Sequence, residues 1–185
     1  ITHPEVTVDP ARPVPRWHLS DTGIRRMRLF AESPEVAEVT AIWASTETKA
    51  IEAAGILAAR LGLGLQVAED LGENDRSATG FLPPPEFEAM ADAFFARPGE
   101  SIRGWERAAD AQTRIAAAVT RILGRHREGD IAILAHGGVG TLLLSHSRRE
   151  PISRAADQPF QGHYWAATLP DRAIIHGWRP IAPRI

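Results

Sequence analysis

The sequence predicts an α/β fold, a three-layer sandwich in which helices cover both faces of a mostly parallel sheet. Short apolar runs rich in β-branched residues alternate with longer segments whose apolar residues recur at helical spacing. Such alternation is typical of parallel sheets. The length of 185 residues suits a single domain over residues 1–185. Because the sequence begins at Ile1 without a methionine, we expect its first strand to be truncated at the start.

The expected elements follow one another in a regular order. We expect strands at 39–43, 65–67 and 131–135, and an antiparallel hairpin of two strands near 163–169 and 173–178. We expect helices at 21–32, 46–61, 86–96, 102–126 and 139–148. Ser20 and Ser101 are the expected caps of the first and fourth helices. Residues 9–16 contain three prolines and predict a loop.

Composition limits which binding partners and which cellular location we expect. The formal net charge is −2 and no basic stripe is present, so we expect neither nucleic acid nor a membrane as partner. No apolar run reaches the ~20 residues of a membrane-spanning helix, and no signal peptide is visible, so we expect a cytoplasmic protein. The lack of cysteine excludes disulfides, thiolate metal sites and a cysteine nucleophile. Oligomeric state stays open, with a homodimer as one alternative.

Polar residues follow each predicted parallel strand, at the edge of the sheet where ligands bind in such folds. In chain order they are Thr2 with His3, Ser45 with Lys49, Glu73, and His136 with Gly137 and Gly138. The glycine pair opens a helix whose N–H groups and dipole favour an anion. Together these residues predict a site for an oxyanion such as phosphate or sulfate, with titratable groups able to act on it.

Six segments, in order along nearly the whole chain, resemble motifs of the histidine phosphatase superfamily, the phosphoglycerate mutase-like proteins. They are Thr2-His3-Pro4, Leu19 to Gly23, Ser45 to Ala50, Leu71-Gly72-Glu73, Gly99-Glu100-Ser101 and His136-Gly137-Gly138. The sequence is a divergent member by this measure, because Thr2-His3-Pro4 stands where the family has Arg-His-Gly, and Lys49 stands where it has a second arginine.

The resemblance implies a phosphoric monoester hydrolase that acts on a small phosphorylated substrate without metal or cofactor. His3 would be the nucleophile that takes the phosphoryl group, and Glu73 the general acid and base. His136 and Lys49 would hold the phosphoryl oxygens. Thr2, Ser45 and the N–H groups of Gly137 and Gly138 would add hydrogen bonds.

The two lost arginines leave the activity open. Lysine offers a point charge and threonine a hydroxyl, whereas arginine offers a planar fork that grips phosphate bidentately. Arg76, three residues after Glu73, is a substitute cation. The alternative hypothesis is a catalytically weak or inactive regulatory module that binds phosphate or another anion. A third is a different reaction on a less charged substrate. A mutase is disfavoured, because it must recognise a doubly phosphorylated cofactor.

Overall fold

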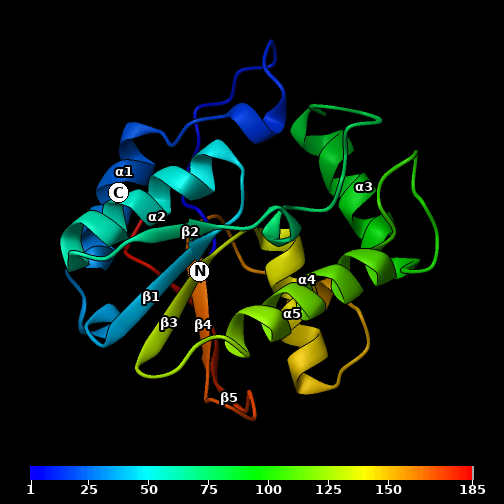
Figure 1. Cartoon of the computed structure of the whole chain (residues 1–185). Coiled ribbons are helices and arrows are strands. Elements are labelled where there is room, and N and C mark those ends of the chain that lie inside the picture. The colour runs from blue at the N-terminus through cyan, green and yellow to red at the C-terminus, as the bar shows by residue number, and fades with distance from the viewer. Residues whose placement is uncertain (185) are drawn as a thin grey trace.

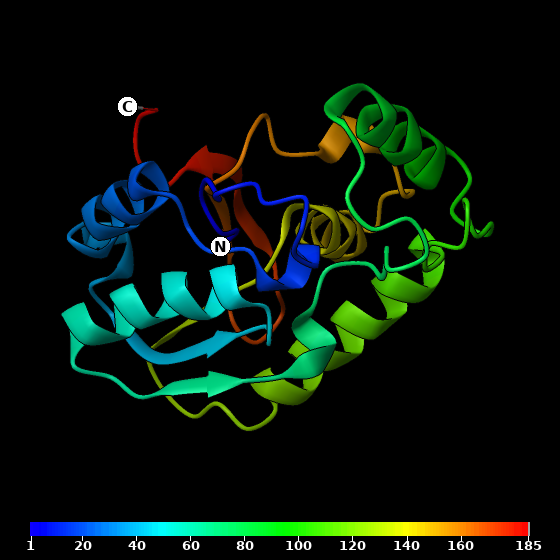
Figure 2. The ribbon, with the colours of Figure 1, turned by 90° about the horizontal axis from the view of Figure 1, so that it is seen from above.

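The computed structural model describes residues 1–184, which form a central sheet with helices on both faces (Figures 1 and 2). The parallel part has the order β2-β1-β3, built from Leu65–Val67, Val39–Ala44 and Asp130–Leu134. β4 (His163–Ala167) and β5 (Ile174–Pro180) form an antiparallel hairpin. The predicted α/β class with a parallel sheet is therefore confirmed.

The first residues of the chain join the two parts of the sheet. Thr2 pairs in parallel with Ala135, just after β3. On its other side the Thr2 N–H donates to the carbonyl of His163, at the start of β4, at 2.8 Å. The segment that carries His3 is thus held between two strands.

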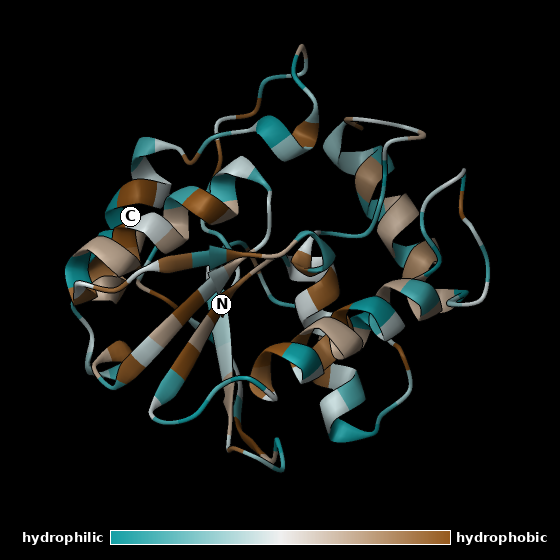
Figure 3. Cartoon of the chain, viewed as in Figure 1, coloured by the Kyte–Doolittle hydropathy of each residue, from teal (hydrophilic) through white to brown (hydrophobic). Residues whose placement is uncertain are grey.

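Successive residues of the central strands face two separate cores, as the two-residue period of a strand requires. Ile42 and Ala44 of β1 pack with α1 (Asp21–Ala31) and α2 (Thr48–Leu61). Trp43 packs on the opposite face with α3 (Pro84–Ala96), α4 (Ala108–Leu123) and α5 (Gly137–Arg148). Figure 3 shows hydrophobic colouring on β1 and β3 and on parts of the helices on either side of them.

Most predicted elements are confirmed to within a few residues. Ser20 caps α1, because its hydroxyl accepts the N–H of Gly23. Gly62 ends α2 in the left-handed conformation, with φ of 68°. The proline-rich loop contains one 3₁₀ turn, Val14–Arg16. Other short 3₁₀ turns cover Pro34–Val36, Glu69–Leu71 and Arg154–Ala156. Within residues 1–184 no helix is long and apolar enough to cross a membrane.

The helix predicted over 102–126 is wrong at its start. Arg103 and Gly104 have φ of 48° and 84°, which no right-handed helix accommodates. Ser101 is not a helix cap, because its hydroxyl donates to the carbonyl of Trp105 at 2.7 Å and closes a loop. Trp105 is nevertheless buried in the same core as α4. The apolar residues of this loop pack in the same core as α4. Their spacing in the sequence therefore resembles that of a helix although the loop is not helical.

Candidate active site

His3 and His136 face each other at the carboxyl edge of the sheet. The pairing of Thr2 with Ala135 places the two following residues side by side. Their ring centroids lie 5.3 Å apart, with the ring planes at 64°. Nδ1 of His3 lies 2.9 Å from the carbonyl of Pro4. Because a carbonyl only accepts, this hydrogen bond puts the proton on Nδ1 and leaves Nε2 with a free lone pair.

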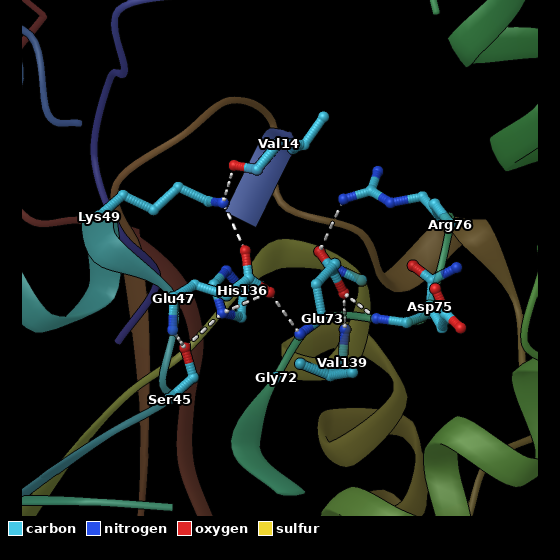
Figure 4. A network of polar contacts seen from close by, with 12 residues as sticks. Val14, Ser45, Glu47, Lys49, Gly72, Glu73, Asp75, Arg76, His136 and Val139 are labelled. Carbon is cyan, nitrogen blue, oxygen red and sulfur yellow. Dashed lines mark hydrogen bonds and ion pairs between the residues drawn. The ribbon is translucent and has the colours of Figure 1, made fainter. Parts of the chain in front are cut away.

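His136 is buried among polar side chains, with 1% of its surface exposed. Its Nε2 lies 2.7 Å from Oγ of Ser45 and 3.3 Å from Oε1 of Glu47 (Figure 4). Its Nδ1 has no hydrogen-bond partner among the described residues. A buried polar nitrogen without a partner costs free energy, so Nδ1 is available to a polar group entering the site.

Glu47 is a functional candidate that the sequence analysis missed. Its Oε2 forms a hydrogen-bonded ion pair with Nζ of Lys49, and its Oε1 accepts the N–H of Glu73 at 3.0 Å (Figure 4). Nζ of Lys49 also donates to the carbonyl of Val14 at 2.9 Å, in the 3₁₀ turn of the proline-rich loop. Both side chains of the pair are nearly buried, with 4% of Lys49 and 11% of Glu47 exposed.

The carboxylate of Glu73 lies over the N-terminus of α5. It accepts the N–H groups of Gly138 at 3.1 Å, of Val139 at 3.0 Å and of its neighbour Asn74 at 3.1 Å. Position 138 requires glycine, because a Cβ there would lie 2.7 Å from Oε1 of Glu73. The Gly138 N–H that was expected to face phosphate thus contacts a carboxylate of the chain.

Arg76 is the second cation of the site. Its guanidinium lies 3.9 Å from Oε2 of Glu73 and packs over the rings of Phe87 and Trp105, 5.1 and 5.5 Å from their centroids. These aromatic contacts fix its position. Arg114 is another residue that the sequence analysis missed. It donates to the carbonyl of Glu73 at 3.2 Å and so holds the loop that precedes Arg76.

Thr2 and Gln158 form a pair beside the two histidines. The Thr2 hydroxyl accepts the N–H of His163 at 3.0 Å and donates to Oε1 of Gln158 at 2.6 Å. This bond orients the amide so that Nε2 lies beside Gly137, where a Cβ would be 2.5 Å away. Gln158 thereby brings an amide group to the start of α5, and no sequence motif marks it.

Burial controls the protonation of the site. It lowers the pKa of His3 from 6.5 to about 3, with the nearby His136 and Lys49 acting in the same direction. Burial also lowers the pKa of His136, against the pull of Glu47 and Glu73. Although burial alone would raise the pKa of Glu47, His136 and Lys49 hold it down to about 2. Near pH 7 both imidazoles are therefore neutral and Glu47 is ionised.

The formal charges of this polar network cancel. Lys49 and Arg76 carry one positive charge each, and Glu47 and Glu73 one negative charge each. Within residues 1–184 no group of three or more histidine and acidic side chains is arranged to hold a metal ion. The site therefore combines a free imidazole nitrogen, two carboxylates and two cations whose charges balance.

Comparison with known proteins relates this geometry to a family. The model of the histidine phosphatase superfamily (branch 1) matches residues 13–166. None of the curated proteins compared matches the sequence. Among solved structures, Bacillus stearothermophilus YhfR is similar with a TM-score of 0.77 at 22% identity, covering 95% of this chain and 92% of that one.

Two phosphatases are similar at the level of the fold. A mycobacterial glucosyl-3-phosphoglycerate phosphatase has a TM-score of 0.74 at 20% identity, covering 96% of this chain and 93% of its own. A phosphoserine phosphatase from Entamoeba histolytica, solved with 3-phosphoglyceric acid, has a TM-score of 0.75 at 12% identity, covering 96% and 94%. The mycobacterial enzyme has also been solved with VO3 and with inorganic phosphate.

Proposed function

The chain belongs to the histidine phosphatase superfamily, and from that premise we propose that it is a metal-independent phosphatase acting on a small phosphate ester through a phosphohistidine at His3. Two structural neighbours are phosphatases named for small phosphate esters, which supports the reaction class and the size of substrate. The observation that carries the proposal is the position of His3, with Nδ1 bonded to Pro4 and the ring facing His136.

In the proposed reaction, the lone pair on Nε2 of His3 attacks phosphorus and the bond from phosphorus to the ester oxygen breaks. The leaving oxygen takes a proton from the carboxyl group of Glu73. Water then attacks the phosphohistidine, gives a proton to Glu73, and releases inorganic phosphate and free His3. Nζ of Lys49, Nδ1 of His136 in its protonated form, and the Ser45 hydroxyl are the donors we assign to the phosphoryl oxygens.

Substitution of the nucleophile tests this proposal. We expect the wild-type protein to release phosphate from small phosphate esters, and His3→Ala to abolish that release. His146→Ala is the matched control, because His146 is exposed on α5 and lies outside the site. A phosphohistidine trapped by rapid acid quench in the wild type, and missing in His3→Ala, would support the covalent step. Equal release rates in wild type and His3→Ala, across a panel of esters, would rule out the phosphatase.

A second candidate function is a regulatory module that binds an anion without turning it over. The observation that favours it is that Lys49 and the N–H groups at the start of α5 are already engaged by Glu47 and Glu73. Binding of inorganic phosphate by calorimetry, with no release from any ester in the panel, would select this function over hydrolysis.

A further inference from the structure

Four of the donors suited to a phosphoryl group contact a carboxylate of this chain. Nζ of Lys49 pairs with Glu47, and the N–H of Val139 donates to Glu73 (Figure 4). The N–H of Gly138 donates to Glu73 as well. Arg76 lies 3.9 Å from Glu73. An incoming anion therefore meets donors that already have a negative partner.

The two carboxylates differ in what the proposed reaction asks of them. Glu73 has a role, because it exchanges a proton with the leaving oxygen and with water. Glu47 has none, yet it contacts Lys49, the imidazole of His136 and the backbone of Glu73. Its side chain is nearly buried and its neighbours keep it ionised, so its charge acts within the site rather than in solvent.

The negative charge of Glu47 weakens binding most for a ligand with two negative charges. Charges in a buried site interact far more strongly than in water, and a buried charge without a partner is costly. With Lys49 and Arg76 balanced by Glu47 and Glu73, a dianion leaves the site with two uncompensated charges. A monoanion of the same shape leaves only one.

We propose that Glu47 is a specificity-determining residue, which as the counter-anion of Lys49 makes the site select singly charged tetrahedral oxyanions over doubly charged ones. The inference rests on the proposed function only in that both concern the same site. It concerns the charge of the ligand and not its hydrolysis, so binding alone can test it.

The test measures binding of two phosphonates, and ³¹P NMR checks that the ester bond of the second stays intact during the titration. Phenylphosphonate is a dianion at alkaline pH, whereas its monomethyl ester is a monoanion of nearly the same shape. We expect calorimetry to show tighter binding of the ester by the wild type. In Glu47→Gln, which keeps the shape and removes the charge, we expect the ratio of the two dissociation constants to move at least tenfold toward the dianion. Glu69→Gln, at an exposed carboxylate in the 3₁₀ turn that follows β2, controls for net charge and should keep the wild-type ratio.

The variant leaves the buried ammonium of Lys49 without its carboxylate, so its folding needs its own readout. If Glu47→Gln is unstable, a dianion should replace the lost counter-ion. We then expect phenylphosphonate to raise the melting temperature of Glu47→Gln more than that of the wild type. An equal or smaller rise would contradict the proposal.

The outcomes separate this inference from the proposed function. An unchanged ratio in Glu47→Gln, in a protein whose phosphate release depends on His3, would overturn the role of Glu47 and leave the phosphatase in place. A tenfold change in a protein that releases no phosphate would keep the charge preference and reject hydrolysis. Failure of the wild type to bind either phosphonate would overturn the inference.

Discussion

Glu73 is the residue on which the proposed chemistry and the observed hydrogen bonds make different demands. As a general acid it must give a proton to the leaving oxygen. In the structure its carboxylate accepts the N–H groups of Gly138, Val139 and Asn74. An ionised carboxylate only accepts hydrogen bonds. Its protonated form must therefore direct the O–H toward the leaving oxygen, while the remaining lone pairs still accept the N–H groups at the start of α5.

This requirement makes the effect of Glu73→Gln depend on the leaving group. Phenyl phosphate has a basic leaving oxygen that needs a proton, and we expect its rate of hydrolysis to fall by about 10²–10⁴-fold. p-Nitrophenyl phosphate leaves as a stable anion, so we expect a much smaller fall. Steady-state kinetics with both esters measures the difference. An equal loss on both esters would mean that Glu73 positions the site without transferring the proton.

Site residues can be placed from sequence where topology alone brings them together. His3 and His136 meet because each directly follows one of two paired segments, and parallel segments end at the same edge. Glu47 and Gln158 were missed for a different reason. The contact of Glu47 with Lys49 depends on an extended residue before the first turn of α2, and that of Gln158 with Thr2 spans 156 positions. Neither the extended backbone of Glu47 nor the long-range contact of Gln158 can be predicted from the neighbouring residues in the sequence.

At the scale of elements, apolar spacing was enough to find helices but not to find their ends. α4 begins after a loop in which Arg103 and Gly104 are left-handed, and nothing in the residue types forbids a helix there. Two glycines in helix interiors differ in the space around them. A Cβ added at Gly55 of α2 would have no atom within 4 Å, whereas one added at Gly140 of α5 would lie 2.9 Å from the Trp178 ring.

These two glycines give a matched pair of substitutions. Gly55→Ala should raise the free energy of unfolding by about 0.5–1 kcal/mol, because alanine loses less backbone entropy on folding and meets no neighbour. Gly140→Ala makes the same change of residue but forces Trp178 to move, so we expect no gain or a loss. Urea denaturation of both variants measures the difference. Equal stabilisation would show that the packing of α5 against β5 has room for a methyl group.

For the whole molecule, the site makes stability depend on pH. In the unfolded chain a histidine takes up a proton near its ordinary pKa of 6.5, whereas the pKa of folded His3 is about 3. Acidification below 6.5 thus adds a proton to the unfolded chain first and favours unfolding. Glu47 acts lower, because its pKa is 4.5 when unfolded and about 2 when folded. The stability it contributes is complete above 4.5 and is lost as the pH falls through that range.

We therefore expect the free energy of unfolding to fall in two stages, beginning below pH 6.5 and steepening below 4.5. Replacing His3 removes one of the buried histidines that drive the first stage, the others being His136 and His163, so His3→Gln should lose less stability than the wild type between these values. His146→Gln, on the exposed end of α5, is the control and should follow the wild-type curve. Urea denaturation across the pH series measures all three proteins. Parallel curves for wild type and His3→Gln would mean that His3 binds a proton as readily in the folded protein as in the unfolded chain. Desolvation of its ring and the nearby His136 and Lys49 argue against that outcome.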